Sequence, residues 1–383
     1  MNSVFIRLGE FNGPEVPYSD KIPRKAQKFF FNFITESKVL KNILIQISIN
    51  HEVDGGEYGY LYEEFGRFPA FIFAWAIAII IRPTSIAANF KVISYCFLEA
   101  IDIEIENADA KITNAIFFSV IFFLICFHLP SKEHSKKLFT GFTIATVLGV
   151  VAMIILQLIL ATTKSELPNG FAFEKHLARG DTNLSGAFFI ILFSFNGWKH
   201  VISIKNLREN PNGNIHKAMC YGSSIVITLC LTYNLTCFFR TSSTEFLKNT
   251  SNPEDSFENN CIKYASLLIL SMAAFCTSAG WLYSSSLIAK RGAENKFWPN
   301  WMQNHRNNII LTCFVACVYN NCSDYYTLIA YNQFVSWISY TLVVKSLLLK
   351  RLKNLTRKDH WKIIPPVVFI LAGIIHLLLK FCI

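Results

Sequence analysis

The sequence predicts an all-α polytopic membrane protein, and three observations favour this class. Hydrophobic residues make up 52% of the 383 residues and charged residues only 16%, well below the roughly 25% that is usual in soluble domains. The apolar residues gather in long runs, most of which reach the length of about 20 residues that a helix needs to cross a bilayer. Loops rich in Lys and Arg alternate with acidic or mixed loops between these runs.

The apolar runs are the expected membrane-spanning helices. The run that ends at Asn320 is the shortest of them. All the runs are expected to be helical, because a helix satisfies its own backbone hydrogen bonds inside a bilayer. They cover residues 70–98, 114–129, 138–161, 185–204, 218–239, 262–289, 308–320, 325–349 and 363–383.

The alternation of loop charge predicts the orientation of the chain. Basic loops follow the second, fourth, sixth and eighth runs, whereas the loop after the first run carries Glu99, Asp102 and Glu104. Because cytoplasmic loops carry an excess of Lys and Arg, the basic loops are expected to be cytoplasmic. The protein is therefore expected to be a multi-pass membrane protein.

Composition also argues against several other classes of protein. The net charge of +10 does not predict nucleic-acid binding, because the Lys and Arg residues are spread over short loops instead of one basic face. The eleven cysteines have no metal-ligand spacing and lie mostly in apolar runs, so no metal or other cofactor is expected. A disulfide between Cys261 and Cys322 remains an alternative to free thiols. No catalytic constellation occurs, and an enzyme is not expected.

Residues 55–85 form the most informative block of the chain. The block begins with Gly55 and Gly56 and ends with Arg82 and Pro83 inside an apolar run. Arg82 would lie about 18 Å along the helix axis, near mid-bilayer, where a charge is costly. This block resembles the L-type amino acid transporters, the light chains of heteromeric amino acid transporters. That family belongs to the amino acid, polyamine and organocation superfamily.

Two more stretches extend the resemblance, in the order that the family has them. One stretch resembles the family's sixth helix, and it contains Phe193, Ser194, Asn196 and Gly197. The other resembles the end of the eighth helix, and it contains Ser284 and Ser285. Because order, orientation and spacing all agree, the resemblance covers the chain from about residue 45 to its end.

The resemblance implies an inverted-repeat (LeuT-like) carrier fold, incomplete here, with about nine transmembrane helices. Such a carrier holds its substrate at mid-membrane between broken helices, whose ends attract the carboxylate and the ammonium group of an amino acid. By resemblance, Phe193 is the aromatic gate over the substrate. The other expected substrate-binding residues are Ser194, Asn196, Gly197, Ser284 and Ser285. Ordinary packing is the alternative for Phe193 and for the serines.

Arg82 has two readings, and the resemblance favours one of them. The family builds its substrate clamp elsewhere, so Arg82 is expected to be structural, bonded to helix carbonyls or to a partner side chain. The alternative is that Arg82 faces the substrate. Gly55, Gly56 and Pro83 are expected to be structural as well.

The chain departs from the family at both ends. The Gly-Ser-Gly-Ile-Phe type of stretch by which the family's first helix binds substrate is absent from these residues, and the family's last helix is expected to be missing as well. Residues 1–50 are therefore expected to be a divergent segment, either an interfacial helix or a remnant of the first two helices. Residues 51–383 are expected to be the amino acid permease domain.

The expected function is transport of L-amino acids, neutral ones foremost, by alternating access in the plasma membrane. The alternative is a non-transporting or truncated relative that serves as a membrane partner or a sensor. Family light chains join a glycoprotein heavy chain through a cysteine in an outer loop. Because residues 99–111 contain no cysteine, a disulfide-linked heavy chain is not expected, although a noncovalent one remains open.

Overall fold

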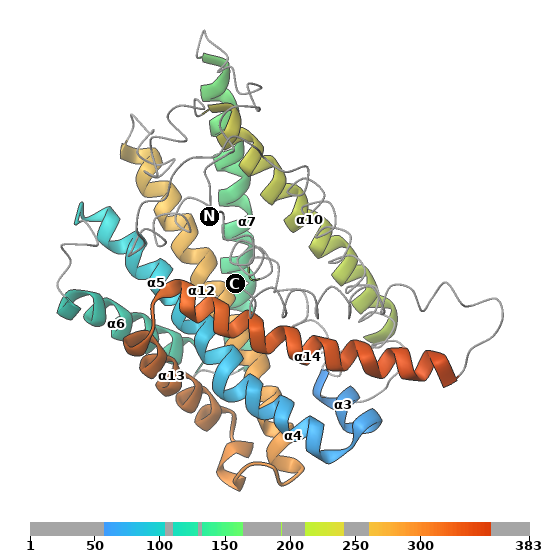
Figure 1. Cartoon of the computed structure of the whole chain (residues 1–383). Coiled ribbons are helices and arrows are strands. Elements are labelled where there is room, and N and C mark those ends of the chain that lie inside the picture. Colours follow the sequence, from blue (N-terminus) through green and yellow to red (C-terminus); the bar gives the residue numbers. More distant parts are fainter. Residues whose placement is uncertain are drawn as a thin grey trace, which may run out of the picture.

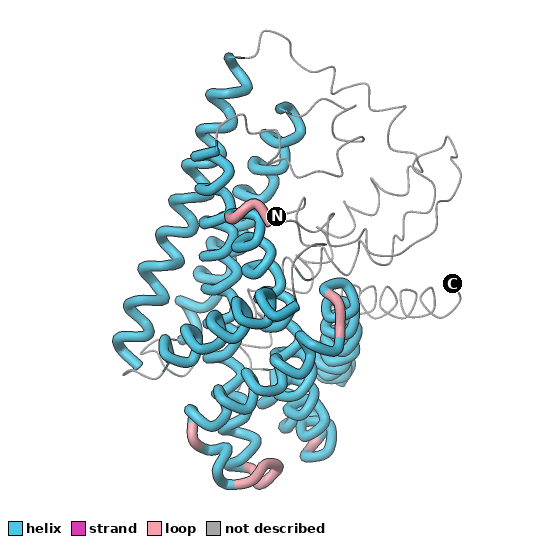
Figure 2. The backbone as a smooth tube through the Cα atoms, turned by 90° about the vertical axis from the view of Figure 1, so that its left-hand side faces the viewer, coloured by secondary structure: helices cyan, strands magenta, loops and turns pink. Residues whose placement is uncertain are grey.

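The computed structural model describes residues 57–103, 110–128, 132–163, 193, 211–240 and 260–353. Within these residues every regular element is helical (Figure 2). Figure 1 shows the helices in space. They are α3 (Glu57–Phe65), α4 (Arg67–Trp75), the π-helix η1 (Ala76–Ile81), α5 (Arg82–Ala100), α6 (Ala110–His128), α7 (Lys132–Thr163), α10 (Pro211–Arg240), α12 (Asn260–Glu294), the 3-10 helix η5 (Asn300–Gln303), α13 (His305–Cys322) and α14 (Tyr325–Lys353).

The elements α4, η1 and α5 join into one long helical rod from Arg67 to Ala100. The turn that separates α3 from this rod is made at Gly66, whose φ of 81° is a left-handed conformation that glycine adopts at little cost. The predicted run at 70–98 is confirmed as helical. The helix continues through Arg82 and Pro83. The polar residues at this point therefore interrupt the apolar pattern of the sequence but not the helix.

The π-helical segment ends at Ile81, directly before Arg82 and Pro83. The N–H of Arg82 donates to the carbonyl of Ile77, five residues earlier, as a π-helix requires. Proline has no N–H to donate to the preceding turn and is tolerated at the start of a helix. The wider turn of η1 therefore lets the rod pass a proline at its centre, and the carbonyls near Ile81 take other donors.

The helix α5 is the centre of the fold, and its most extensive contacts are with α12 and then with α13 and α14. Figure 1 shows α5 and α12 side by side, with α14 across them. Asn89 ties α5 to α12, because its Nδ2 donates to Ser278 Oγ at 3.1 Å. Buried residues of these helices and of α6 form one hydrophobic core, which includes Phe90, Phe117 and Trp281.

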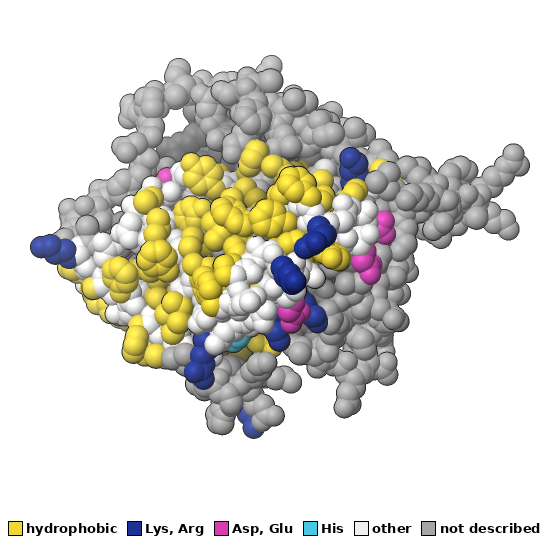
Figure 3. Space-filling model, turned by 90° about the horizontal axis from the view of Figure 1, so that it is seen from below, with side chains coloured by type: hydrophobic (Ala, Val, Ile, Leu, Met, Phe, Trp, Pro, Cys, Tyr) yellow, Lys and Arg dark blue, Asp and Glu magenta, His cyan; other side chains and the backbone are white. Residues whose placement is uncertain are grey.

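Four of the described helices are long and apolar enough to cross a membrane: 67–100, 111–128, 139–159 and 263–294. In the most apolar stretch of 67–100, 67% of the residues are buried inside the protein. In the most apolar stretch of 139–159, only 17% are buried. The first is thus a central span and the second a peripheral one. Figure 3 shows hydrophobic side chains gathered across one face of the molecule.

The described part of α10 contains a shorter apolar helix, Tyr221–Tyr233. The helices α10, α13 and α14 coincide with the predicted runs at 218–239, 308–320 and 325–349. The predicted runs at 185–204 and 363–383 lie outside the described residues, apart from Phe193. The count of about nine spans therefore stays a prediction. An ion pair joins α5 to α12 at the predicted outer end, where Lys263 Nζ lies 3.0 Å from Glu99 Oε1.

Candidate functional site

A cluster of buried polar side chains surrounds the junction of η1 and α5. Thr84 and Ser85 follow Pro83, and both are almost fully buried. Thr84 Oγ1 donates to the carbonyl of Ile80 at 2.6 Å, and Ser85 Oγ donates to that of Ile81 at 2.7 Å. These hydroxyls therefore satisfy the carbonyls that the π-helix and Pro83 leave available.

Asn332 of α14 completes this cluster from the opposite side. Its Nδ2 donates to Ser85 Oγ at 2.6 Å and to Thr84 Oγ1 at 3.0 Å, and it also bonds to the carbonyl of Ile81. Its Oδ1 accepts from Gln333 Nε2 at 3.1 Å. Asn332 is completely buried, so this network fixes α14 against the middle of the long rod. We call these four residues, Thr84, Ser85, Asn332 and Gln333, the junction network.

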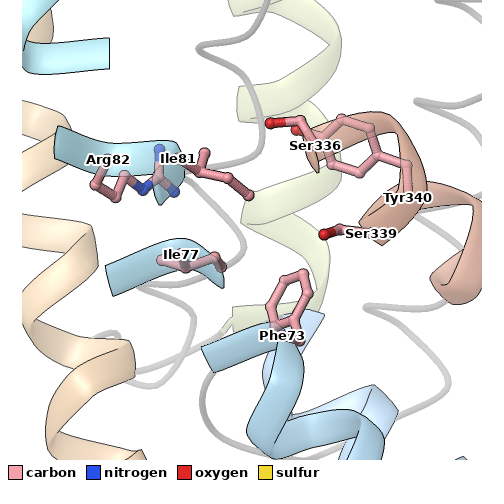
Figure 4. Close-up of a pocket in the computed structure, with 7 residues that line it drawn as sticks. All are labelled: Phe73, Ile77, Ile81, Arg82, Ser336, Ser339 and Tyr340. Carbon is pink, nitrogen blue, oxygen red and sulfur yellow. The ribbon is translucent and has the colours of Figure 1, made fainter. Parts of the chain in front are cut away.

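Arg82 is buried beside the junction network, with only 2% of its surface exposed. Arg82 is one of the residues that line a cavity of about 10 Å³ between the rod and α14. Figure 4 shows Arg82 on one side of this space and Ser336 and Ser339 on the other. The cavity is lined by Phe73, Ile77, Ile81, Arg82, Ser336, Ser339 and Tyr340. Its size leaves no room for an amino acid in this conformation.

Phe193 lies in the hydrophobic core against α12. Its ring packs edge-to-face on Trp281, with ring centroids 5.6 Å apart and planes at 71°. The carbonyl of Trp281 accepts from Ser284 Oγ at 3.0 Å. Phe193 thus contacts α12 one turn before Ser284.

The predicted serines are buried in α12. Ser284 and Ser285 have only 1% and 2% of their surface exposed, and neither lines the cavity beside Arg82. Oγ of the next serine, Ser286, lies 2.6 Å from Nδ1 of His305, and this hydrogen bond joins α12 to the start of α13. Ser194, Asn196, Gly197, Gly55 and Gly56 lie outside the described residues. The substrate-binding assignment of these residues therefore stays a prediction.

Arg82 and Pro83 lie buried at the centre of the rod, and their structural role stays a prediction. The structure adds residues that the sequence reading missed, foremost Asn332, Ser336, Ser339 and Trp281. A signal for three of them exists in the sequence, since positions 332, 336 and 339 recur at helical spacing within the apolar run at 325–349. Across the parts of the chain that the structure describes, no cluster of metal-ligating side chains occurs.

A second polar contact holds α3 against the segment after α12. Asn295 Nδ2 donates to Tyr58 Oη at 2.6 Å, and Arg67 lies over the ring of Phe297 with its Cζ 5.8 Å from the ring centroid. Burial raises the pKa of Tyr58 above its usual value, although the hydrogen bond from Asn295 acts in the opposite sense. Tyr58 is therefore a neutral phenol at physiological pH, and its hydrogen bond to Asn295 is one between neutral groups.

Comparison with known proteins identifies the family. A family model described as amino acid permease matches residues 42–383. The human b(0,+)-type amino acid transporter 1 is 26% identical over 336 residues, which cover 84% of this chain and 68% of the relative. The mouse Asc-type amino acid transporter 1 is 23% identical over 345 residues, covering 85% and 64%. The cystine/glutamate transporter of Pongo abelii is 26% identical over 198 residues, covering 50% and 38%.

These matches extend over the same region as the sequence motifs. The chain spans about two thirds of the length of the b(0,+)-type and Asc-type relatives. The family model covers most of the chain and the helices suit membrane spans. The chain therefore belongs to the amino acid permease family of membrane transporters, among the L-type amino acid transporters that its motifs indicate.

Proposed function

We propose that the protein carries L-amino acids, neutral ones foremost, across the plasma membrane by alternating access. The observation that supports this most directly is the contact of Phe193 with Trp281. Phe193 is the residue that the family resemblance assigns to the gate, and the contact brings it to the part of α12 that carries Ser284 and Ser285. The proposed site thus gathers residues from segments far apart in the sequence.

The chemistry of the proposed site follows from broken helices. A break at Asn196 and Gly197 would expose backbone N–H and C=O groups, because glycine tolerates unusual dihedrals and asparagine tolerates them better than most residues. Positive helix ends attract a carboxylate, and free carbonyls accept from an ammonium group. Every amino acid carries both groups, so the backbone supplies the general recognition and side chains such as Phe193 supply closure.

The junction network has a supporting role in this proposal. It holds α14 against the rod without any charged pair, through hydrogen bonds of Asn332 to Thr84 and Ser85. Interhelical hydrogen bonds of this kind are worth about 1 kcal/mol each in membranes. Contacts of that strength fix a resting arrangement and still permit helices to move during alternating access.

We also propose that a heavy-chain partner, where one is bound, is held without a disulfide. Cys96 is the cysteine nearest to the predicted outer loop, and it is buried in α5 and takes part in no disulfide. Burial of this depth keeps a thiol from reaching a partner chain. Residues 104–109 of that loop lie outside the described residues.

Uptake by purified protein tests the proposal. The full chain, together with any residues that precede Met1 in its transcript, is reconstituted in liposomes and given labelled neutral L-amino acids. We expect saturable uptake above protein-free liposomes, and competition by unlabelled L-amino acids. Absence of uptake by correctly folded protein would favour the non-transporting alternative.

A further inference from the structure

The segment from Lys290 to Arg306 joins the end of α12 to the start of α13 and carries an excess of positive charge. It contains four Lys and Arg residues but only one acidic residue, Glu294. The carboxylate of Glu294 lies 3.9 Å from Lys290 Nζ and 2.9 Å from Arg291 Nη1. Lys296 and Arg306 are exposed, and within the described parts of the chain neither forms an ion pair. These two cations are therefore available to a ligand. We call residues 290–306 the linking segment.

The end of α12 holds Lys296 in a left-handed conformation, with a φ of 62°. Its N–H donates to the carbonyl of Ala293 at 3.0 Å, and the N–H of Phe297 donates to the carbonyl of Gly292 at 2.9 Å. This pair of bonds is the Schellman motif, in which glycine is the usual left-handed residue because a Cβ makes this conformation costly. A lysine thus occupies a position at which glycine would be more stable. Strained backbone positions of this kind cluster at functional sites.

The linking segment folds back against the end of α12 and exposes an aromatic side chain. Met302 of η5 packs with Ala289 and Ala293 of α12. Its neighbour Trp301 points the other way and is 51% exposed. Tryptophan is enriched at membrane–water interfaces, because its ring is apolar and its N–H is polar. The segment therefore combines free cations with an aromatic residue suited to the level of lipid headgroups.

The charge pattern of the loops predicts which leaflet the linking segment faces. The ion pair of Lys263 with Glu99 lies at the predicted outer end of α12, so the other end of this helix is on the predicted cytoplasmic side. That end lies at the bottom of Figure 1, and Figure 3 shows Lys and Arg side chains beside hydrophobic ones on this face. The cytoplasmic leaflet carries anionic lipids, and clusters of about four or more Lys and Arg residues directly after a spanning helix attract them.

We propose that Lys296 and Arg306, with Trp301 between them in the sequence, form a binding surface for the headgroups of anionic phospholipids in the cytoplasmic leaflet. The two cations attract the phosphate groups, and Trp301 lies at the headgroup level beside them. The Schellman motif fixes the backbone of Lys296, so less conformational freedom is lost when a lipid binds. The proposal rests on the predicted orientation of the chain and does not depend on amino acid transport.

Thermal unfolding of the full chain in detergent micelles tests the proposal, because a lipid that binds the folded state raises the Tm. The micelles contain the same fraction of either phosphatidylglycerol, which is anionic, or phosphatidylcholine, which has no net charge. We expect phosphatidylglycerol to raise the Tm by about 4 °C more than phosphatidylcholine does, the shift for two cations near an anionic surface in a large chain. Added salt is expected to reduce this difference, because it screens exposed charges. Equal Tm values in the two lipids would overturn the proposal.

Lys296→Gly separates lipid binding from folding, because the two effects have opposite signs. Glycine relieves the left-handed backbone, so we expect the Tm without added lipid to stay unchanged or to rise by about 2 °C. We expect the additional shift with phosphatidylglycerol to fall by about half, since one of the two cations is lost. A shift that stays complete in the variant that combines Lys296→Gly with Arg306→Gln would contradict the proposed surface.

Two controls distinguish a local lipid surface from other effects of charge. Lys111 is exposed at the predicted outer end of α6, and Lys111→Ala is expected to leave the lipid shift unchanged. A loss as large as in Lys296→Gly would show that only the net charge matters, and would overturn the assignment. The second control replaces the lipid by inorganic phosphate, for which we expect no shift. A shift as large as with phosphatidylglycerol would identify a site for soluble anions instead of lipid.

Discussion

Phe193 packs edge-to-face on Trp281, with ring centroids 5.6 Å apart, and only 6% of its surface is exposed. Aromatic pairs of this geometry are worth about 0.5–1.5 kcal/mol beyond their buried area. The contact is the link between the predicted gate residue and α12. Substitution of Phe193 is therefore the most direct way to test the proposed site.

Replacement of Phe193 by Leu is expected to slow uptake of neutral amino acids by about fivefold or more. Leucine keeps an apolar side chain of similar volume, so the fold is retained, but it loses the edge-to-face contact with Trp281. The measurement is initial uptake rate divided by surface expression. Phe314→Leu is the matched control, because Phe314 is 65% exposed on α13 and its loss is expected to leave uptake unchanged. Equal rates for the two variants would remove Phe193 from the gate.

Replacement of Asn332 by Ala is expected to lower the free energy of unfolding by about 1–2 kcal/mol. The change removes hydrogen bonds to Thr84, Ser85 and Ile81, and interhelical bonds in membranes are worth about 1 kcal/mol each. Thermal unfolding in detergent measures the loss. Tyr331→Ala on the same helix is the control, since Tyr331 is 52% exposed, and a loss as large in this variant would show that the junction network contributes little.

Replacement of Gly292 by Ala is expected to destabilise the protein. A Cβ at this position would overlap the indole of Trp298, which would have to move from its stack on Trp75. Gly222→Ala provides the opposite case, because nothing lies within 4 Å of a Cβ there. That variant is expected to be neutral or stabilised by up to about 1 kcal/mol through helix propensity. Thermal unfolding distinguishes the two, and equal Tm values would contradict close packing at Gly292.

Replacement of Asp324 by Ala is expected to destabilise α14 at neutral pH by about 0.5–2 kcal/mol, as loss of a helix cap does. Oδ2 of Asp324 accepts from the N–H groups of Tyr326 and Thr327, each at 3.1 Å. Partial burial acts to raise the pKa of Asp324, but the hydrogen bonds from Thr327 and Tyr326 outweigh it and hold the pKa below its usual value of 3.8.

The sign of the pH dependence follows from this lowered pKa. The carboxylate stabilises the folded state above its ordinary pKa, and this contribution is lost as the pH falls through the lowered folded-state value. The stability difference between Asp324→Ala and the unaltered chain should therefore be constant from pH 7 to about pH 5 and should shrink below about pH 4. A difference that stays constant down to pH 3 would contradict the capping role.

The sequence predicted the main helical elements because long apolar runs determine them. The runs at 70–98 and 262–289 coincide with the rod and α12, apart from a few residues, several of them polar, that the helices add at each end. The short run at 308–320 belongs to an 18-residue helix, since α13 begins at His305 with a side-chain cap from Asn304. Hydropathy does not detect such polar extensions.

The passage of the rod through Pro83 could not be predicted in the same way. It depends on η1 and on Asn332, which lies in a different span far along the sequence. Periodicity describes one segment at a time, whereas the junction network depends on which helices meet. The same limit applies to Trp281, which shows its contact with Phe193 only in the folded chain.

The most direct test of amino acid transport is uptake of a labelled neutral L-amino acid by proteoliposomes that contain the full chain, with protein incorporation measured in each preparation. We predict uptake that saturates with substrate, is reduced by unlabelled L-amino acid and falls about fivefold or more in Phe193→Leu. Uptake no greater than in protein-free liposomes, from protein that unfolds cooperatively and is therefore folded, would contradict a transport function.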